Sequence, residues 1–302
     1  MVTISLPILL GWFARKLDFM SDDFDTRLSR LLLNFGLPCM ILASLATSKG
    51  LPSPQDMLWA LAGETILLLI AMAVGYAITS VMRAPHGMEG IYRFTVTFSN
   101  CGLIGFPVIS AVLGSDALLI AAIGLIPVNL IIFTVGVLMF TGEGRGLKKQ
   151  LRGFVACLKS PTLLASVFVF ICSLVRFTGF GLVGPSLSLV GQMTTPLALL
   201  LTGSSLATYK PLEMFTSWRA YIATACRLVV APLLGLATLR LLPIDSAMVA
   251  ILVLEASMPV GTNGILYCLE YGVDTKPMVQ CTFLTIVFAI LSIPLVTTIA
   301  VG

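Results

Sequence analysis

Long runs without a charged side chain dominate the sequence and constrain what it can fold into. Six runs contain no Asp, Glu, Lys or Arg, and they span residues 31–48, 94–115, 117–142, 160–175, 177–209 and 277–302. Three further apolar runs hold one charge each, at 57–82 with Glu64, 220–239 with Arg227 and 246–269 with Glu255. A helix needs roughly 20 apolar residues to cross a bilayer. These runs are therefore predicted to be transmembrane helices.

Composition supports a membrane protein, because only 11% of the 302 residues are charged and 58% are hydrophobic. A soluble domain typically carries about a quarter charged residues. The apolar run 1–13 is followed by Arg15 and Lys16, so we interpret it as a short first helix rather than a signal peptide. Glycines and a proline near the start of run 177–209 predict a turn, with a helix from about Ser186. The expected fold is an all-α membrane protein of about ten transmembrane helices.

The distribution of basic residues predicts how these helices are oriented. The odd-numbered loops hold fourteen Lys or Arg residues and the even-numbered loops hold three, with Arg227 left inside a helix. Cytoplasmic loops carry the excess of positive charge in membrane proteins. We therefore expect a multi-pass protein of the cell (inner) membrane with both termini outside.

A repeat is indicated by a constant offset of 158 residues. This offset aligns Pro38 with Pro196 and Ser99 with Ser257, and it also aligns residues 114 with 272 and 116 with 274. An odd number of helices in each half inverts the second half, as in many secondary transporters. The prediction is a 5+5 inverted repeat: residues 1–142, a basic cytoplasmic linker at 143–159, and residues 160–302.

Helices four and nine are predicted to be broken and to cross. Both contain glycine, proline and asparagine near the middle of an apolar span, at 99–107 and 257–264. Unwound backbone survives at membrane depth only inside protein or beside a water-filled cavity. The candidate substrate-binding residues are Asn100, Cys101, Gly102, Gly105, Pro107, Pro259, Gly261, Thr262 and Asn263. Pro38 and Pro196 are candidate helix breakers outside this site.

Two charges at bilayer depth are candidates for coupling or substrate binding, because such residues are costly in a membrane. Arg227 is a counter-charge for an anion or, alternatively, a donor to carbonyls freed by a break or a partner of Glu255 or Glu64. Glu255 is a proton carrier, a sodium ligand or the partner of Arg227. Glu64 is expected to be structural. H⁺ and Na⁺ both stay open as the coupling ion, and no cofactor or metal site is expected.

Enzyme and ATPase motifs are missing from the sequence, which has no HExxH, GxSxG or P-loop. The favoured function is a secondary transporter, a permease for a small organic anion such as a carboxylate. A sodium-coupled bile-acid-type symporter, a channel and a membrane receptor are the alternatives. The expected partners are the organic anion and membrane lipid, with a homodimer as an alternative to a monomer, and no nucleic acid.

The segment Asn100-Cys-Gly-Leu-Ile-Gly-Phe-Pro107 resembles the fourth-helix motif of the auxin efflux carrier family. Further matches are Leu37-Pro38, Arg227-Leu-Val-Val-Ala-Pro232, Met258-Pro-Val-Gly-Thr-Asn263 and Glu270-Tyr-Gly272. The resemblance implies the fold of bile-acid symporters and sodium/proton antiporters. It implies a scaffold of helices 1, 2, 6 and 7, a transport domain of helices 3–5 and 8–10, substrate at the crossover, and an elevator-like step.

Two departures from the family pattern separate this chain from the plant auxin exporters. Its first helix is shorter, and the long cytoplasmic loop of the plant proteins is absent. The resemblance is therefore to the bacterial malate permease-like members.

Overall fold

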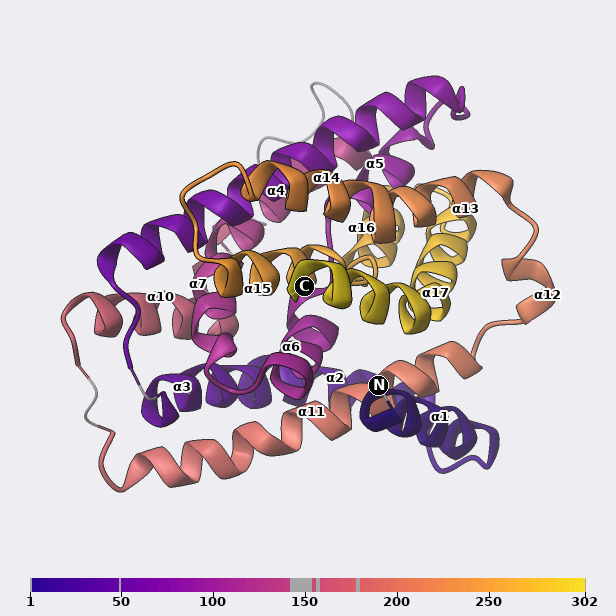
Figure 1. Cartoon of the computed structure of the whole chain (residues 1–302). Helices are drawn as coiled ribbons and strands as arrows, with labels where there is room; N and C mark the ends of the chain where they lie inside the picture. The colour runs from indigo at the N-terminus through magenta and orange to yellow at the C-terminus, as the bar shows by residue number, and fades with distance from the viewer. Residues whose placement is uncertain (1, 49, 142–153, 156–157, 178–179, 302) are drawn as a thin grey trace. The chain divides into compact units, whose positions relative to one another are not determined.

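The computed structural model describes residues 2–48, 50–141, 154–155, 158–177 and 180–301, and every regular element in these ranges is a helix (Figure 1). The all-helical prediction is confirmed. Most of the predicted basic linker 143–159 lies outside the described residues, as does Gly179. Five helical segments among the described residues are long and apolar enough to span a membrane: 22–47, 54–81, 117–140, 218–239 and 276–300. Shorter apolar helices cover 101–113, 161–174 and 246–256.

The chain forms two compact units. The first unit comprises Met1–Leu61, Cys101–Ile126 and Leu158–Tyr209, and the second comprises Ala62–Asn100, Pro127–Cys157 and Lys210–Gly302. The first unit contains α1 (Val2–Lys16), α2 (Asp22–Leu31), η1 (Leu32–Gly36), α3 (Leu37–Thr47), η2 (Cys101–Gly105), α6 (Phe106–Leu113), α10 (Pro161–Leu174) and α11 (Val183–Ala207). Helices α4 (Pro54–Val81) and α7 (Ala117–Ile131) contribute residues to both units.

The second unit contains the remaining helices. These are α5 (Glu89–Thr97), η3 (Ile132–Gly136), α8 (Val137–Thr141), α12 (Pro211–Met214), α13 (Trp218–Ala225), η4 (Cys226–Val230), α14 (Ala231–Leu239), α15 (Ser246–Ala256), α16 (Asn263–Tyr271) and α17 (Lys276–Val301). Helix α17 packs against α13, α15 and α5. In Figure 1 it lies beside α15.

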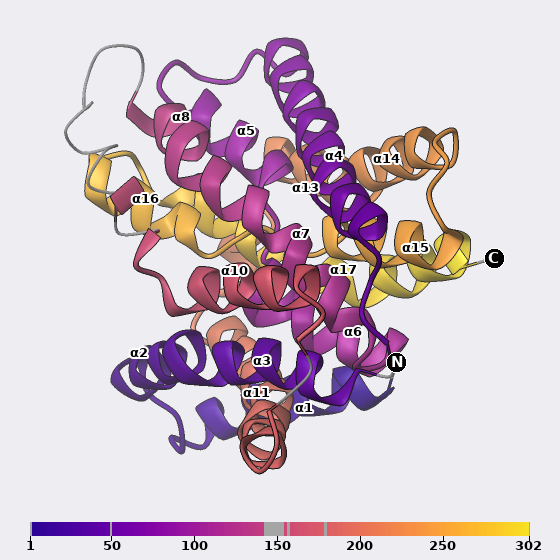
Figure 2. The same cartoon turned by 90° about the vertical axis from the view of Figure 1, so that its left-hand side faces the viewer.

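Small residues bring helices of the first unit into close contact. A Cβ atom on Gly11 would lie 2.0 Å from the Leu200 carbonyl oxygen, and one on Gly203 would lie 1.8 Å from the Ile8 carbonyl oxygen. Helices α1 and α11 therefore run antiparallel with touching backbones, as small residues permit in membrane proteins. Figure 2 shows α10 alongside α3, to which it also packs.

Proline follows three of the π-helical turns among the described residues. Pro38, Pro107 and Pro232 each stand second in the helix after η1, η2 and η4. Proline lacks an N–H donor and its ring clashes with the carbonyl four residues earlier. A wider π turn upstream accommodates both effects.

Several boundaries differ from the sequence predictions. The second predicted helix begins at Asp22 rather than residue 31, because Ser21 caps it and accepts a hydrogen bond from the Phe24 N–H. Helix α1 is 15 residues long and is not among the five spanning segments. Helix α11 begins at Val183, three residues before the predicted Ser186.

Candidate functional site

The second unit contains two helices that end where the sequence predicts breaks. Helix α5 ends at Thr97 and α15 ends at Ala256, and short extended segments follow each of them. Ser99 and Val260 form an isolated antiparallel bridge. The Asn100 N–H donates to the Pro259 carbonyl at 2.7 Å, and the Gly261 N–H donates to the Phe98 carbonyl at 3.0 Å. The two segments therefore cross in contact, and we call residues 98–100 with 258–261 the crossing.

The crossing is buried and polar at once. Phe98, Met258 and Val260 are 0% exposed, and Asn100 is 9% exposed. The N–H of Val260 donates to the Thr285 hydroxyl on α17 at 3.3 Å. Backbone groups of the extended residues thus find partners inside the protein, as a low-dielectric setting requires.

Arg227 joins the ends of both interrupted helices. Its Nη1 donates to the carbonyls of Val96 and Thr97 at 2.9 and 3.1 Å. Its Nη2 donates to the Ala256 carbonyl at 2.6 Å and its Nε to the Met258 carbonyl at 3.0 Å. The side chain is 2% exposed. A cation at these two helix C-termini also meets the negative ends of their dipoles, so the geometry matches the alternative of a donor to freed carbonyls.

Two carboxylates are buried in the same unit. Glu64 on α4 is 1% exposed and Glu255 on α15 is 0% exposed. Glu64 and Arg227 line one cavity of about 10 Å³, together with Thr97, Ser99 and Pro232. Such a volume holds about one water molecule. Glu64, which was expected to be structural, therefore lies beside Arg227, next to the crossing.

The predicted substrate-binding residues fall in both units. Asn100 and the segment Pro259–Asn263 belong to the second unit, where Asn263 begins α16 and Thr262 precedes it. Thr262 is exposed, and its side chain makes no capping hydrogen bond to the helix. Cys101, Gly102, Gly105 and Pro107 belong to the first unit, in η2 and the first turn of α6. Of these residues, the structure joins Asn100 to Pro259 by a backbone hydrogen bond, and another joins Gly261 to Phe98.

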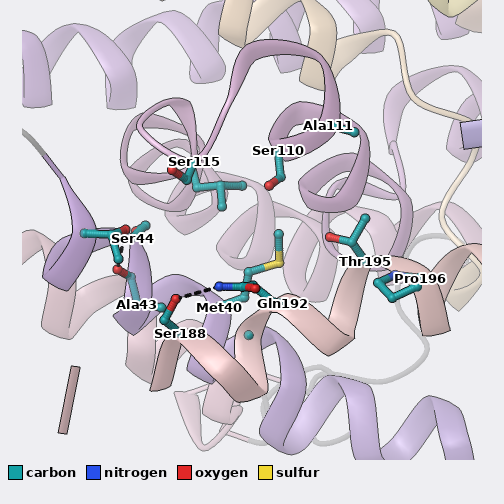
Figure 3. A pocket seen from close by; sticks show the side chains of 13 residues that line it. Met40, Ala43, Ser44, Ser110, Ala111, Ser115, Ser188, Gln192, Thr195 and Pro196 are labelled. Atoms are coloured by element: carbon teal, nitrogen blue, oxygen red, sulfur yellow. Dashed lines mark hydrogen bonds between the residues drawn. The ribbon is translucent and has the colours of Figure 1, made fainter. Parts of the chain in front are cut away.

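A polar cavity of about 480 Å³ lies in the first unit (Figure 3). Its polar side chains are Ser44, Thr47, Ser110, Ser115, Ser188, Gln192 and Thr195. Helices α3, α6 and α11 supply most of the lining, and Gln192 Nε2 donates to the Ser188 hydroxyl at 3.0 Å. Pro196 also lines the cavity, whereas Pro38 lies in the first turn of α3. The cavity is of a size suited to a small ligand.

Sequence reasoning missed several of these residues. Thr285, which receives the Val260 N–H, sits in an apolar run with several other hydroxyls and had no distinguishing signal. Gln192 could have been found, because an amide four residues after Ser188 is unusual inside an uncharged run.

Comparison with known proteins identifies relatives along nearly the whole chain. It is 24% identical over 290 residues to the uncharacterized transporter YfdV of Escherichia coli K12, covering 91% of this chain and 88% of that protein. An uncharacterized transporter of Methanothermobacter thermautotrophicus is 22% identical over 301 residues, covering 97% of this chain and 95% of its own length. One of Methanocaldococcus jannaschii is 24% identical over 308 residues, with the same coverage.

The family model described as "membrane transport protein" matches residues 1–297. Together with the names of the relatives, this match indicates a membrane transporter rather than an enzyme. With its several apolar helices, the chain is a multi-pass membrane protein. It belongs to the membrane transport protein family, the family of the auxin efflux carriers.

Proposed function

We propose that this chain is a secondary transporter that moves a small organic anion, a carboxylate, and that the anion binds beside the crossing. The observation that carries the proposal is the antiparallel contact of residues 98–100 with 258–261, held at buried helix ends in a membrane transport family member. Interrupted helices of this kind form substrate sites in secondary transporters.

The chemistry at the crossing favours an anion over a cation. The carbonyls of Val96, Thr97, Ala256 and Met258 accept hydrogen bonds from the positively charged Arg227, so these acceptors are already occupied. Helix α16 begins at the crossing, and the N-terminus of a helix attracts negative charge. The amides of Asn100 and Asn263 add donors suited to carboxylate oxygens.

The local pairing also favours an inverted 5+5 repeat of ten spans. An antiparallel pair has a two-fold axis of its own, and here that axis would relate Ser99 to Val260. The difference between 260 and 99 is 161, which is three more than the offset of 158 from the sequence. A three-residue displacement at a break is compatible with one ancestral repeat. The excess of basic residues in the odd loops supports an inner-membrane orientation with both termini outside.

An elevator-like step is the mechanism that we propose. The division of the chain into two compact units favours it, because helices 1, 2, 6 and 7 of the predicted scaffold all belong to the first unit. Helices 8–10 and most of helix 3 belong to the second unit, whereas residues 101–126 of helices 4 and 5 belong to the first. The polar cavity beside Gln192 would give the anion a hydrated route.

The test uses purified protein in liposomes loaded with unlabelled malate-like acid, with labelled acid added outside. Saturable counterflow is expected, since a carrier exchanges its substrate across the membrane. A linear, non-saturating flux would indicate a channel, and binding without flux would indicate a receptor. Uptake that requires Na⁺ and favours sterol-type acids would indicate the bile-acid-type symporter.

Site variants sharpen this test. Asn100→Ala and Asn263→Ala should each reduce counterflow about tenfold or more, because a lost hydrogen bond of about 1.4 kcal/mol corresponds to a factor of ten. Asn34→Ala is the matched control, since Asn34 is exposed and its amide only donates to the Arg30 carbonyl. Full activity in both site variants would refute this placement of the substrate.

A further inference from the structure

One buried cation shares the interior of the second unit with two buried carboxylates. Arg227, Glu64 and Glu255 are 2%, 1% and 0% exposed. If both carboxylates were ionised, the group would carry a net charge of −1 at a depth where water is scarce. An uncompensated buried charge is strongly unfavourable. The group is therefore expected to bind one more positive charge.

Arg227 also binds backbone carbonyls, and this limits the hydrogen bonds that it can donate to the carboxylates. Its guanidinium donates to four backbone carbonyls at the ends of α5 and α15. Glu64 Oε2 is buried and accepts no hydrogen bond from the described residues. A protonated carboxyl is neutral and needs no such donor. Glu64 lines the small cavity together with Arg227, whereas Glu255 does not line it, so Glu64 is the side chain placed to take up the extra charge.

The cavity discriminates between a proton and a metal ion. Its volume of about 10 Å³ leaves room for about one water molecule. Arg227 lines the same cavity and repels any cation in it, whereas a proton bound covalently to Glu64 needs no space. Apart from Glu64 and Arg227, the residues of the lining are uncharged, and Glu255 directly precedes the lining residue Ala256.

The other charged residue of α4 is Asp56, which lies eight residues before Glu64, about 12 Å along the helix at 1.5 Å per residue. After Glu64, the next titratable residue of α4 is Tyr76. The Arg93 guanidinium stacks over its ring, 4.4 Å from the ring centroid. Twelve residues of helix separate Tyr76 from Glu64, which is about 18 Å at 1.5 Å per residue. On α14, Gly235 faces the apolar side chain of Leu67 of α4.

We propose that Glu64 is the proton-coupling site of this transporter, so that one proton crosses the membrane with each organic anion. The inference rests on the proposed function. In the step, the Glu64 carboxylate takes up one proton from the side of entry to form a neutral carboxylic acid. The acid returns the same proton on the other side, so no oxidant, reductant or leaving group is involved.

The position of Arg227 explains how the proton and the anion would be coupled. Protonation of Glu64 changes the net charge of the three groups from −1 to 0. Arg227 is hydrogen-bonded to Thr97, which directly precedes the crossing, and to Met258 within it. An anion beside the crossing therefore meets less repulsion when Glu64 is protonated, and linkage makes the anion raise proton affinity equally.

Two measurements test the proposal in the full-length protein. Infrared difference spectra of the protein in nanodiscs, recorded across pH, should show a carboxylic-acid carbonyl band that Glu64→Gln removes. Liposomes containing a trapped pH dye should show acidification when malate is added outside, and a pH gradient should drive its accumulation. At pH values above the one at which Glu64 loses its proton, malate binding should weaken about tenfold per pH unit, as linkage of one proton requires.

The variant Glu64→Gln should keep malate counterflow, which needs no net proton movement, and should lose accumulation driven by the pH gradient. Glu270→Gln is the matched control, because Glu270 is exposed on α16, and it should behave as the wild type. Proton-driven accumulation retained in Glu64→Gln, or a Na⁺ gradient driving accumulation without acidification, would overturn the coupling site. Absence of counterflow in the wild type would instead refute the proposed function, while the infrared band would still report on Glu64.

Discussion

Replacing Arg227 by methionine should strongly destabilise the second unit. Methionine fills a similar volume without charge or N–H groups, so the carbonyls of Val96, Thr97, Ala256 and Met258 would lose four hydrogen bonds. Those carbonyls belong to helix ends buried away from water. The same change would leave the carboxylates of Glu64 and Glu255 without a nearby cation.

The size of the effect follows from the number of bonds. Hydrogen bonds in membrane proteins average about 0.6 kcal/mol, and bonds from charged donors contribute roughly 1.5–3 kcal/mol in soluble proteins. Four bonds then stabilise the fold by about 2 to 12 kcal/mol. Removing one partner from a buried ion group typically costs about 3–5 kcal/mol, which falls in the same range.

Thermal unfolding in detergent, followed by tryptophan fluorescence, measures the change. A loss of about 3 kcal/mol corresponds to a fall in Tm of roughly 6–12 °C for a chain of this class. Arg227→Lys should fall between wild type and Arg227→Met, because lysine keeps the charge but lacks the planar fork of donors. Arg240→Met is the control, since Arg240 is exposed and donates only to the Ile299 carbonyl. An Arg227→Met Tm no lower than that of the control would refute the reasoning.

Three further variants test other contacts. Gly203→Ala should lower Tm by several degrees, because its Cβ would lie 1.8 Å from the Ile8 carbonyl oxygen. The clash should loosen α1 from α11, which faster proteolysis of α1 would report. Gly90→Ala should lower Tm similarly, since its Cβ would lie 1.7 Å from the Met139 carbonyl oxygen. Gln192→Leu should slow malate counterflow and leave Tm within about 2 °C, because it removes a polar group from the cavity wall; unchanged counterflow would exclude that cavity from the route.

The helices were predictable where one signal dominated. Long apolar runs located α4, α7 and α17, of which only the α4 run holds a charge, Glu64, because the pattern has no competing explanation. The start of α2 was missed because its first turns are acidic and basic, and only the Ser21 cap marks that boundary. Hydropathy carries no information on such a cap.

The site was predictable at the level of the breaks and less so at the level of partners. Glycine, proline and asparagine at 99–107 and 257–264 indicated both interruptions, at equivalent places of the predicted repeat. The pairing of Ser99 with Val260 could not be predicted from the sequence. A pairing shifted by three residues would bring together two segments of the same composition. Four carbonyl partners for Arg227 were likewise unpredictable, since backbone acceptors have no sequence signature.

The buried arginine and the broken helices depend on each other for hydrogen-bond partners. An interrupted helix leaves carbonyls without partners at its C-terminal end, and at membrane depth water does not replace those partners. Arginine offers five donors on a rigid plane, and Arg227 uses that plane to satisfy two helix ends at once. With the C-terminal ends thus occupied, the helices that follow the two crossing segments present their N-termini: η2 begins at Cys101, and α16 begins at Asn263, where the Thr262 side chain makes no capping hydrogen bond. Filled carbonyl acceptors and helix N-termini beside them would favour negative charge over positive charge, as the proposed anion requires.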